Sequence, residues 1–239
     1  CRRSAWRSVR QSKIAEARKV LAALTGKPLP DDAELAVHQP QKTEQSLAAL
    51  FSNNRALSTL MFFQAFFMCL LMVYGLGSWL PKLMTMAGYG FGSSLMFLLF
   101  LNIGGIIGAI GGGWLSDRFH PRPVLMLFFT LAAVSLALLG FKSHVAVLYF
   151  LVTVAGATTS GSQILLYAYV AQFYPTAIRS TALGWSSGVG RIGAILGPVL
   201  GGALLAMQLS HQMNFLAFVV PGALAVIAIM LTAGRKEAV

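Results

Sequence analysis

The chain has 239 residues, of which 56% are hydrophobic and 10% are charged, and its mean hydropathy is +0.71. Its 18 lysines and arginines against 7 acidic residues give a formal charge of +11. This composition excludes a disordered basic tail, because such tails are poor in apolar residues. It also argues against a nucleic-acid-binding protein, because too few polar residues are present to build a solvated basic face. A membrane protein is the class that fits.

The first 56 residues differ in character from the rest of the chain. They hold ten of the basic residues and five of the seven acids, so this segment alone carries +5. Within residues 12–25 apolar residues recur at helical spacing between charged ones, which predicts an amphipathic helix on the inner membrane surface. Residues 28–45 are rich in polar residues and predict a solvated linker. We expect residues 1–56 to form a cytoplasmic basic segment.

From residue 57 the chain is nearly uncharged and contains six apolar runs. A helix needs about 20 such residues to cross roughly 30 Å of hydrocarbon. The runs lie at residues 57–80, 93–115, 124–141, 145–171, 180–207 and 213–233. Short turns separate them, the first of which begins at Pro81. The predicted fold class is an all-α membrane protein, with a six-helix transmembrane bundle at residues 57–234 and a short tail at residues 235–239.

The distribution of lysine and arginine predicts the orientation of these helices. Counted on alternate sides of the membrane, 15 basic residues fall on one side and only Lys82 and Lys142 on the other. Because the excess of basic residues stays in the cytoplasm, both ends of the chain are predicted to be cytoplasmic. Arg191 is left as the one basic residue inside a run.

Two patterns suggest enzymes, and both fail on context. Residues 188–193 match the dinucleotide-binding pattern G-x-G-x-x-G, but they lie inside an apolar run and no acid follows about 20 residues later. Residues 184–188 match the nucleophile pattern G-x-S-x-G, but the downstream acid Glu237 follows His211, the reverse of the required order. Neither cysteine has a candidate partner. We therefore predict no enzymatic activity, no cofactor and no metal site.

The fifth run has two distinct faces at 100° per residue. One face contains Gly184, Ser187, Gly188, Arg191, Ile195, Pro198 and Gly202. The other contains Ser186, Gly190, Gly193, Gly197 and Gly201. Small residues at such spacing let helix backbones approach closely, so the second face is predicted to pack. The glycines at 104, 108 and 112 in the second run carry the same prediction.

Arg191 is the strongest candidate for a binding residue. An arginine near the middle of a membrane is expensive and faces a partner or a polar cavity. One interpretation is a structural pair with a carbonyl or carboxylate of a neighbouring helix. The other is a clamp that holds an anionic substrate through two parallel hydrogen bonds. Because no run contains Asp or Glu away from its ends, the sequence favours the anion site.

Other polar residues inside the runs are weaker candidates. In the fourth run one face carries Gly156, Thr159, Ser160, Gln163 and Tyr167, and this stripe could line a water-filled path. Asn102 and Gln64 are single polar residues, for which helix packing is the alternative. Tyr74 and Trp79 fit an aromatic belt at the membrane surface.

Two stretches resemble a known family. Residues 113–125, GWLSDRFHPRPVL, resemble the inter-helix motif of the major facilitator superfamily, G-x-L-x-D-R-x-G-R-R-x-x-L. The chain departs from it at His120, where glycine is usual, and at Pro121, where a base is usual. Residues 174–198 are similar to the penultimate helix of the aromatic acid:proton symporters. Sugar-type members often have Glu where this chain has Gln172, which also favours the aromatic-acid branch.

The resemblance covers residues 50–235 and implies helices seven to twelve of a twelve-helix carrier in a bacterial-type inner membrane. It implies proton-coupled uptake of benzoate-type or 4-hydroxybenzoate-type carboxylates by alternating access, with an N-terminal six-helix half as partner. The resemblance implies that Arg191 contacts the substrate carboxylate, and the polar residues of the runs add Gln163, Tyr167, Thr159, Asn102 and Gln64 as predicted contacts. The implied network that closes the cytoplasmic side is Asp117, Arg118, Arg122 and Arg179. Two alternatives stay open: a symporter for another organic acid or sugar, and a truncated half-carrier that transports nothing alone.

Overall fold

The computed structural model describes residues 47–52, 55–141, 143–208 and 211–232. The helices are α2 (Leu47–Phe51), α3 (Ala56–Met86), α4 (Phe91–Arg118), α5 (Pro121–Leu139), α6 (Val145–Phe173), α7 (Thr176–Ala206) and α8 (His211–Leu231). The chain divides into two units, Cys1–Gln41 and Lys42–Val239, and every described residue belongs to the second. The predicted amphipathic helix at 12–25, the linker at 28–45 and the tail at 235–239 lie outside the described residues.

Six of the helices in the described part of the chain, α3 to α8, are long and apolar enough to cross a membrane. The described residues form helices and the turns between them, with no strand among them. The predicted all-α membrane fold with six spanning helices is therefore confirmed. The short helix α2 precedes the first span and was not predicted.

The first predicted helix end is wrong. Helix α3 continues through Pro81 to Met86, because an internal proline removes a single hydrogen bond, to the carbonyl four residues back. The helix ends instead at Met86, two residues before Gly88, whose φ of +98° is left-handed. The amide of Gly88 donates to the carbonyl of Thr85, and the amide of Tyr89 donates to that of Met84. This is the Schellman arrangement, which glycine adopts without strain.

Helix bounds also differ from prediction at the turns that carry charge. Helix α4 extends to Arg118, three residues past its predicted end, and α7 begins at Thr176, four residues before its predicted start. The charged residues of these predicted turns therefore lie in the end turns of helices. Helix α5 begins at Pro121, where a missing amide hydrogen is harmless.

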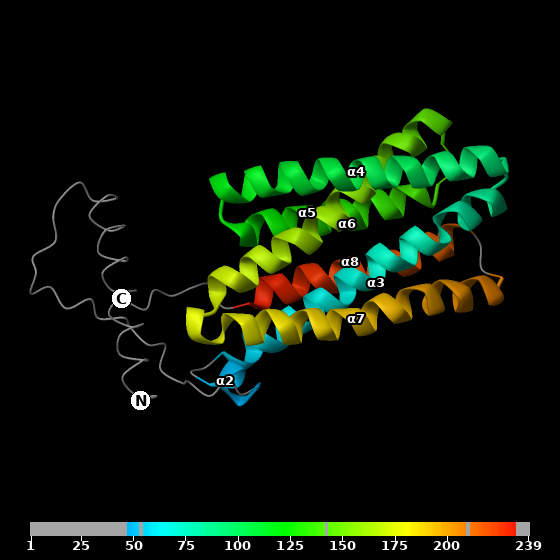
Figure 1. Cartoon of the computed structure of the whole chain (residues 1–239). Coiled ribbons are helices and arrows are strands. Elements are labelled where there is room, and N and C mark those ends of the chain that lie inside the picture. The colour runs from blue at the N-terminus through cyan, green and yellow to red at the C-terminus, as the bar shows by residue number, and fades with distance from the viewer. Residues whose placement is uncertain (1–46, 53–54, 142, 209–210, 233–239) are drawn as a thin grey trace, which may run out of the picture. The chain divides into compact units, whose positions relative to one another are not determined.

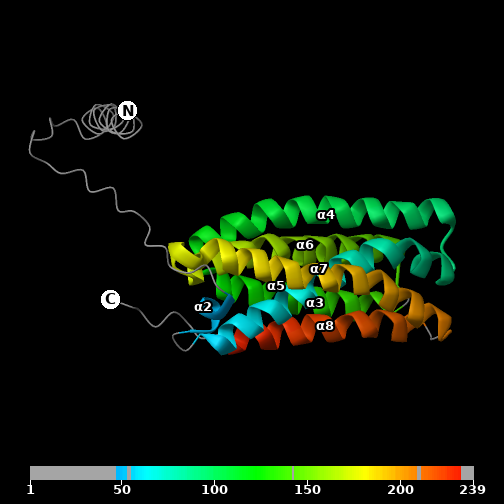
Figure 2. The same ribbon diagram turned by 60° about the horizontal axis from the view of Figure 1, so that its bottom comes forward.

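The contacts between helices show that the bundle consists of two equivalent three-helix units. The most extensive contacts join α3 with α7 and α4 with α6, followed by α5 with α6, α5 with α8 and α3 with α8. Figures 1 and 2 show α4 beside α6 and α3 beside α7. If α3, α4 and α5 are exchanged for α6, α7 and α8, this set of pairs is unchanged. Because α3 and α6 run in opposite directions, the two three-helix units are an inverted repeat, a common plan in transporter halves.

Glycines set the closest contacts in both repeats. A Cβ on Gly193 of α7 would collide with the carbonyl of Phe67 in α3, and one on Gly104 of α4 with that of Thr153 in α6. The predicted packing roles of the α4 and α7 glycines are therefore confirmed. All five small residues of the predicted packing face of α7 are buried: Ser186, Gly190, Gly193, Gly197 and Gly201.

The next turn of each pair repeats the match. Gly197 meets the carbonyl of Leu71, and Gly108 meets that of Ala157. One turn further the match is looser, because Gly201 meets Trp79 of α3, whereas Gly112 meets Phe128 of α5 first and Leu165 of α6 only at 3.5 Å. Arg191 lies two residues before Gly193 in α7, and Asn102 lies two residues before Gly104 in α4, so the two residues correspond in the repeat. Tyr74 lies three residues after Leu71 in α3, and Ser160 lies three residues after Ala157 in α6, so these two residues also correspond.

Candidate functional site

One end of the bundle gathers basic residues. Helices α3, α5 and α7 begin at this end, and α4, α6 and α8 end at it. The arginines near these termini are Arg55, Arg118, Arg122 and Arg179. We call this the basic end. Lys82 lies near the other end of α3, so the described part of the bundle has its charge concentrated on one side.

The four residues predicted to close the cytoplasmic side all lie at the basic end, but the described residues do not join them in one network. Asp117 and Arg118 are exposed in the last turn of α4. Within the described part of the chain Asp117 has no ion-pair partner. Arg122 instead donates from its Nη2 to the carbonyl oxygen of Met230, 2.8 Å away at the end of α8. The Nε of Arg179 is buried and has no hydrogen-bond partner among the described residues.

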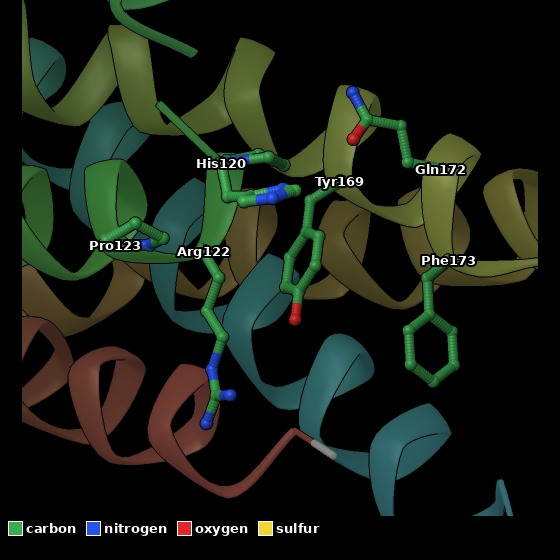
Figure 3. A pocket seen from close by; sticks show the side chains of 7 residues that line it. His120, Arg122, Pro123, Tyr169, Gln172 and Phe173 are labelled. Carbon is green, nitrogen blue, oxygen red and sulfur yellow. The ribbon is translucent and has the colours of Figure 1, made fainter. Parts of the chain in front are cut away.

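A cavity of about 320 Å³ lies beside Arg122 at the basic end. Its lining residues are His120, Pro121, Arg122, Pro123, Tyr169, Gln172 and Phe173. In Figure 3 the rings of His120 and Tyr169 lie near each other, while the guanidinium of Arg122 points toward α8. The positions at which the sequence departs from the family patterns, His120, Pro121 and Gln172, therefore share one cavity. It lies at the end of the bundle, away from the middle of the helices.

The middle of the bundle contains one cation, Arg191, among the described residues. It is the sixteenth of the 31 residues of α7, and its side chain is exposed. Its Nη1 donates to the hydroxyl oxygen of Tyr74 in α3 over 3.4 Å. A Cβ built on either neighbouring glycine of the same face, Gly184 or Gly188, meets nothing within 4 Å. The predicted contrast between a packed face and an open face of α7 is confirmed.

Tyr74 and Trp79 both hydrogen-bond to α7, and their place in an aromatic belt stays a prediction. Tyr74 lies near the middle of α3, and Trp79 lies closer to its far end, where its indole Nε1 donates to the carbonyl oxygen of Pro198 over 2.7 Å. The two hydrogen bonds, Tyr74 with Arg191 and Trp79 with Pro198, stand on either side of the contact between Gly75 and Gly197. Together they fix the register of α3 against α7.

The stripe predicted on α6 packs partly against its neighbours. The side chain of Thr159 is buried, its hydroxyl donates to the carbonyl of Ala155, and its own carbonyl lies 3.7 Å from the sulfur of Cys69 in α3. The ring of Tyr167 lies edge-on to Phe66, with centroids 5.0 Å apart.

The remaining candidates for substrate contact are more accessible. Gln163 and Gln64 are half-buried. Asn102 is exposed, and its amide donates to the carbonyl of Leu98, one turn back in α4. That bond leaves the amide oxygen of Asn102 available as an acceptor. A contact of any of these residues with substrate stays a prediction.

Sequence reasoning missed a buried network at the basic end. The hydroxyl of Thr59 in α3 donates to the carbonyl of Leu50 in α2 over 2.7 Å, and its oxygen lies 2.7 Å from the hydroxyl of Tyr174. Because the hydrogen of Thr59 is used on a carbonyl, Tyr174 is the donor between the two hydroxyls. Burial raises the pKa of Tyr174, while the bond to Thr59 and the charge of Arg55 act in the opposite direction. No local pattern signals this network, since its residues are far apart in sequence.

The family follows from a match over most of the described bundle. The family model described as Major Facilitator Superfamily matches residues 102–238. The chain belongs to the Major Facilitator Superfamily. Its fold agrees, since the structure of the Escherichia coli fucose:proton symporter superposes with a TM-score of 0.66 at 19% identity, covering 80% of this chain and 47% of that one.

Curated relatives confirm the resemblance to the aromatic-acid branch. The benzoate transport protein of Acinetobacter baylyi is 50% identical over 78% of this chain and 40% of its own length. The gentisate transporter of Corynebacterium glutamicum is 48% identical over 64% of this chain and 35% of its own. The 4-hydroxybenzoate transporter of Pseudomonas aeruginosa is 36% identical over 93% and 50%. The chain thus spans half or less of the length of these relatives.

Proposed function

We propose that this chain forms the second six-helix half of a proton-coupled carrier for aromatic carboxylates. The relatives named above are transporters of benzoate, gentisate and 4-hydroxybenzoate, and each matches over half or less of its length. Superfamily carriers rock two six-helix bundles about a site between them. The chain would therefore supply one wall of the site, and its partner half would supply the other.

Arg191 is the observation that carries the proposal. It lies at mid-helix on the open face of α7, and the described residues place no carboxylate near it. A guanidinium with free N–H groups binds a carboxylate through two parallel hydrogen bonds. The proposal extends to accessory contacts from Gln163, Tyr167 and Thr159 on α6, Gln64 on α3 and Asn102 on α4, the repeat counterpart of α7.

The proposed orientation places the basic end in the cytoplasm of a cell with a bacterial-type inner membrane. Lysine and arginine are retained on the cytoplasmic side, and the four arginines at helix ends lie together there. In this orientation Asp117, Arg118, Arg122 and Arg179 would close the cytoplasmic side against the partner half. The exposed carboxylate of Asp117 is then a group available to that half.

Uptake by a completed carrier tests the proposal. The 239-residue chain is fused behind the part of the Acinetobacter baylyi benzoate transport protein that precedes the matched region. Cells expressing the fusion should take up labelled benzoate or 4-hydroxybenzoate, and a protonophore should stop the uptake. The chain expressed alone should insert and transport neither compound. Arg191→Ala should abolish uptake at unchanged membrane levels, and Arg191→Lys should impair it, because lysine lacks the planar two-point contact.

Lys82→Ala is the matched control, because it removes an exposed cation from the same bundle, far from Arg191. It should transport as the parent does. Uptake of sugars or aliphatic acids in place of aromatic acids would support the alternative symporter. An inserted fusion that transports none of these compounds, or normal uptake by Arg191→Ala, would contradict the proposal.

A further inference from the structure

The register of α3 and α7 sets a tyrosine beside the proposed anion-binding arginine. Gly193 and Gly197 bring the backbones of the two helices into direct contact, which leaves little freedom to slide. Within this register the hydroxyl of Tyr74 lies 3.4 Å from Nη1 of Arg191. Both side chains are exposed on the face that the described helices leave open, with 40% of Tyr74 accessible.

Helix packing does not require this pair. The inverted repeat packs α4 against α6 through the same glycine contacts, and there the corresponding residues are Asn102 and Ser160. The amide of Asn102 bonds back to its own helix and makes no bond to α6. The same backbone architecture therefore forms without a bond between these two positions. Helix packing therefore does not explain the bond between Tyr74 and Arg191. This bond occurs in the repeat that carries the mid-helix cation, Arg191.

The position of the Tyr74 hydroxyl lets it orient the guanidinium of Arg191. A guanidinium has five N–H donors in a rigid plane on a flexible stem. A hydrogen bond from one Nη to the tyrosine oxygen restricts the rotation of this plane and leaves the remaining N–H donors for a ligand. The hydrogen of the tyrosine hydroxyl stays available as a further donor. A carboxylate that approaches the open face would then meet donors that are already oriented, which lowers the ordering cost of binding.

We propose that Tyr74 is a positioning residue that orients the Arg191 guanidinium for the carboxylate of the substrate. This inference rests on the proposed function and deepens it, because it names the second residue of the anion site. Tyr74 acts through Arg191, so its loss weakens binding without removing the cation.

Substitution by phenylalanine isolates the hydroxyl. Tyr74→Phe in the fusion keeps the ring and its packing and removes the acceptor. The KM for benzoate should rise about fivefold to tenfold, as expected for the loss of one hydrogen bond of ordinary net strength, while the maximal rate per inserted molecule stays within about twofold. The control is Tyr149→Phe, which removes a tyrosine hydroxyl in α6, where the ring stacks on Phe100. Its KM should equal that of the parent.

The outcomes separate this inference from the proposed function. If the parent fusion inserts and takes up no aromatic acid, the proposed function fails. If the parent transports and Tyr74→Phe shows an unchanged KM, or only a lower maximal rate, the positioning role is overturned and the proposed function stands. Because KM does not depend on the amount of carrier in the membrane, a poorly inserted variant still gives a decisive answer.

Discussion

Gly197→Ala tests whether α3 and α7 are held together by direct backbone contact. An added Cβ would lie 2.5 Å from the carbonyl oxygen of Leu71 and 2.8 Å from the amide nitrogen of Gly75. Ordinary contact begins at about 3.4 Å, so α7 must move away from α3 by about 0.9 Å. Both obstructing atoms belong to the main chain and cannot rotate aside.

The magnitude follows from two opposing effects. Overpacking a close contact costs about 1 to 3 kcal/mol, and rigid backbone neighbours place this site in the upper part of that range. Alanine is a better helix former than glycine by about 1 kcal/mol. The expected net loss is about 1 to 2 kcal/mol, which should lower the thermal unfolding temperature of the purified chain in detergent, followed by circular dichroism.

Gly184→Ala is the matched control in the same helix. A Cβ there meets nothing within 4 Å, so only the gain in helix propensity remains. Its unfolding temperature should equal or exceed that of the parent. If both variants unfold at the same temperature, the packing described for α3 and α7 is refuted.

Two further predictions concern the ends of the bundle. Because burial raises the pKa of Tyr174, the folded chain keeps this hydroxyl protonated where a free tyrosine ionises, so stability should fall as the pH rises through about 10. Tyr174→Phe should flatten that fall in unfolding temperatures measured from about pH 8 to pH 11, and an unchanged slope would contradict the assignment. Single cysteines at Ser116 and Ser143, which lie toward opposite ends, should react with an impermeant maleimide added outside intact cells only at position 143. Labelling at position 116 would reverse the proposed orientation.

The packed and open faces of α7 could be predicted from sequence because a helix repeats every 3.6 residues and small residues at that spacing bury. The same argument identified the glycines of α4. The exposed position of Arg191 followed from the helical phase that separates it from the packed face of α7. These are properties of single helices, and they need no knowledge of which helices meet.

Features that depend on two helices could not be predicted. The sequence predicted only an aromatic belt for Tyr74. Its bond to Arg191 depends on the register of α3 against α7, which the sequence of a single helix does not reveal. The network around Thr59 likewise joins three segments that are distant in the chain. The end of α3 was misplaced because Pro81 is a weaker terminator than the left-handed Gly88 that follows it.

The glycine contacts also determine which parts of the bundle can move separately. Helices that touch through their main chains have no side-chain layer that could repack to let one slide past the other, so α3 and α7 form a single mechanical unit, as do α4 and α6. If the chain works as proposed, any tilt of α7 during transport would carry α3 with it. In the proposed carrier Arg191 and Tyr74 would therefore move together, and the distance between them would stay the same whichever side of the membrane the site faces.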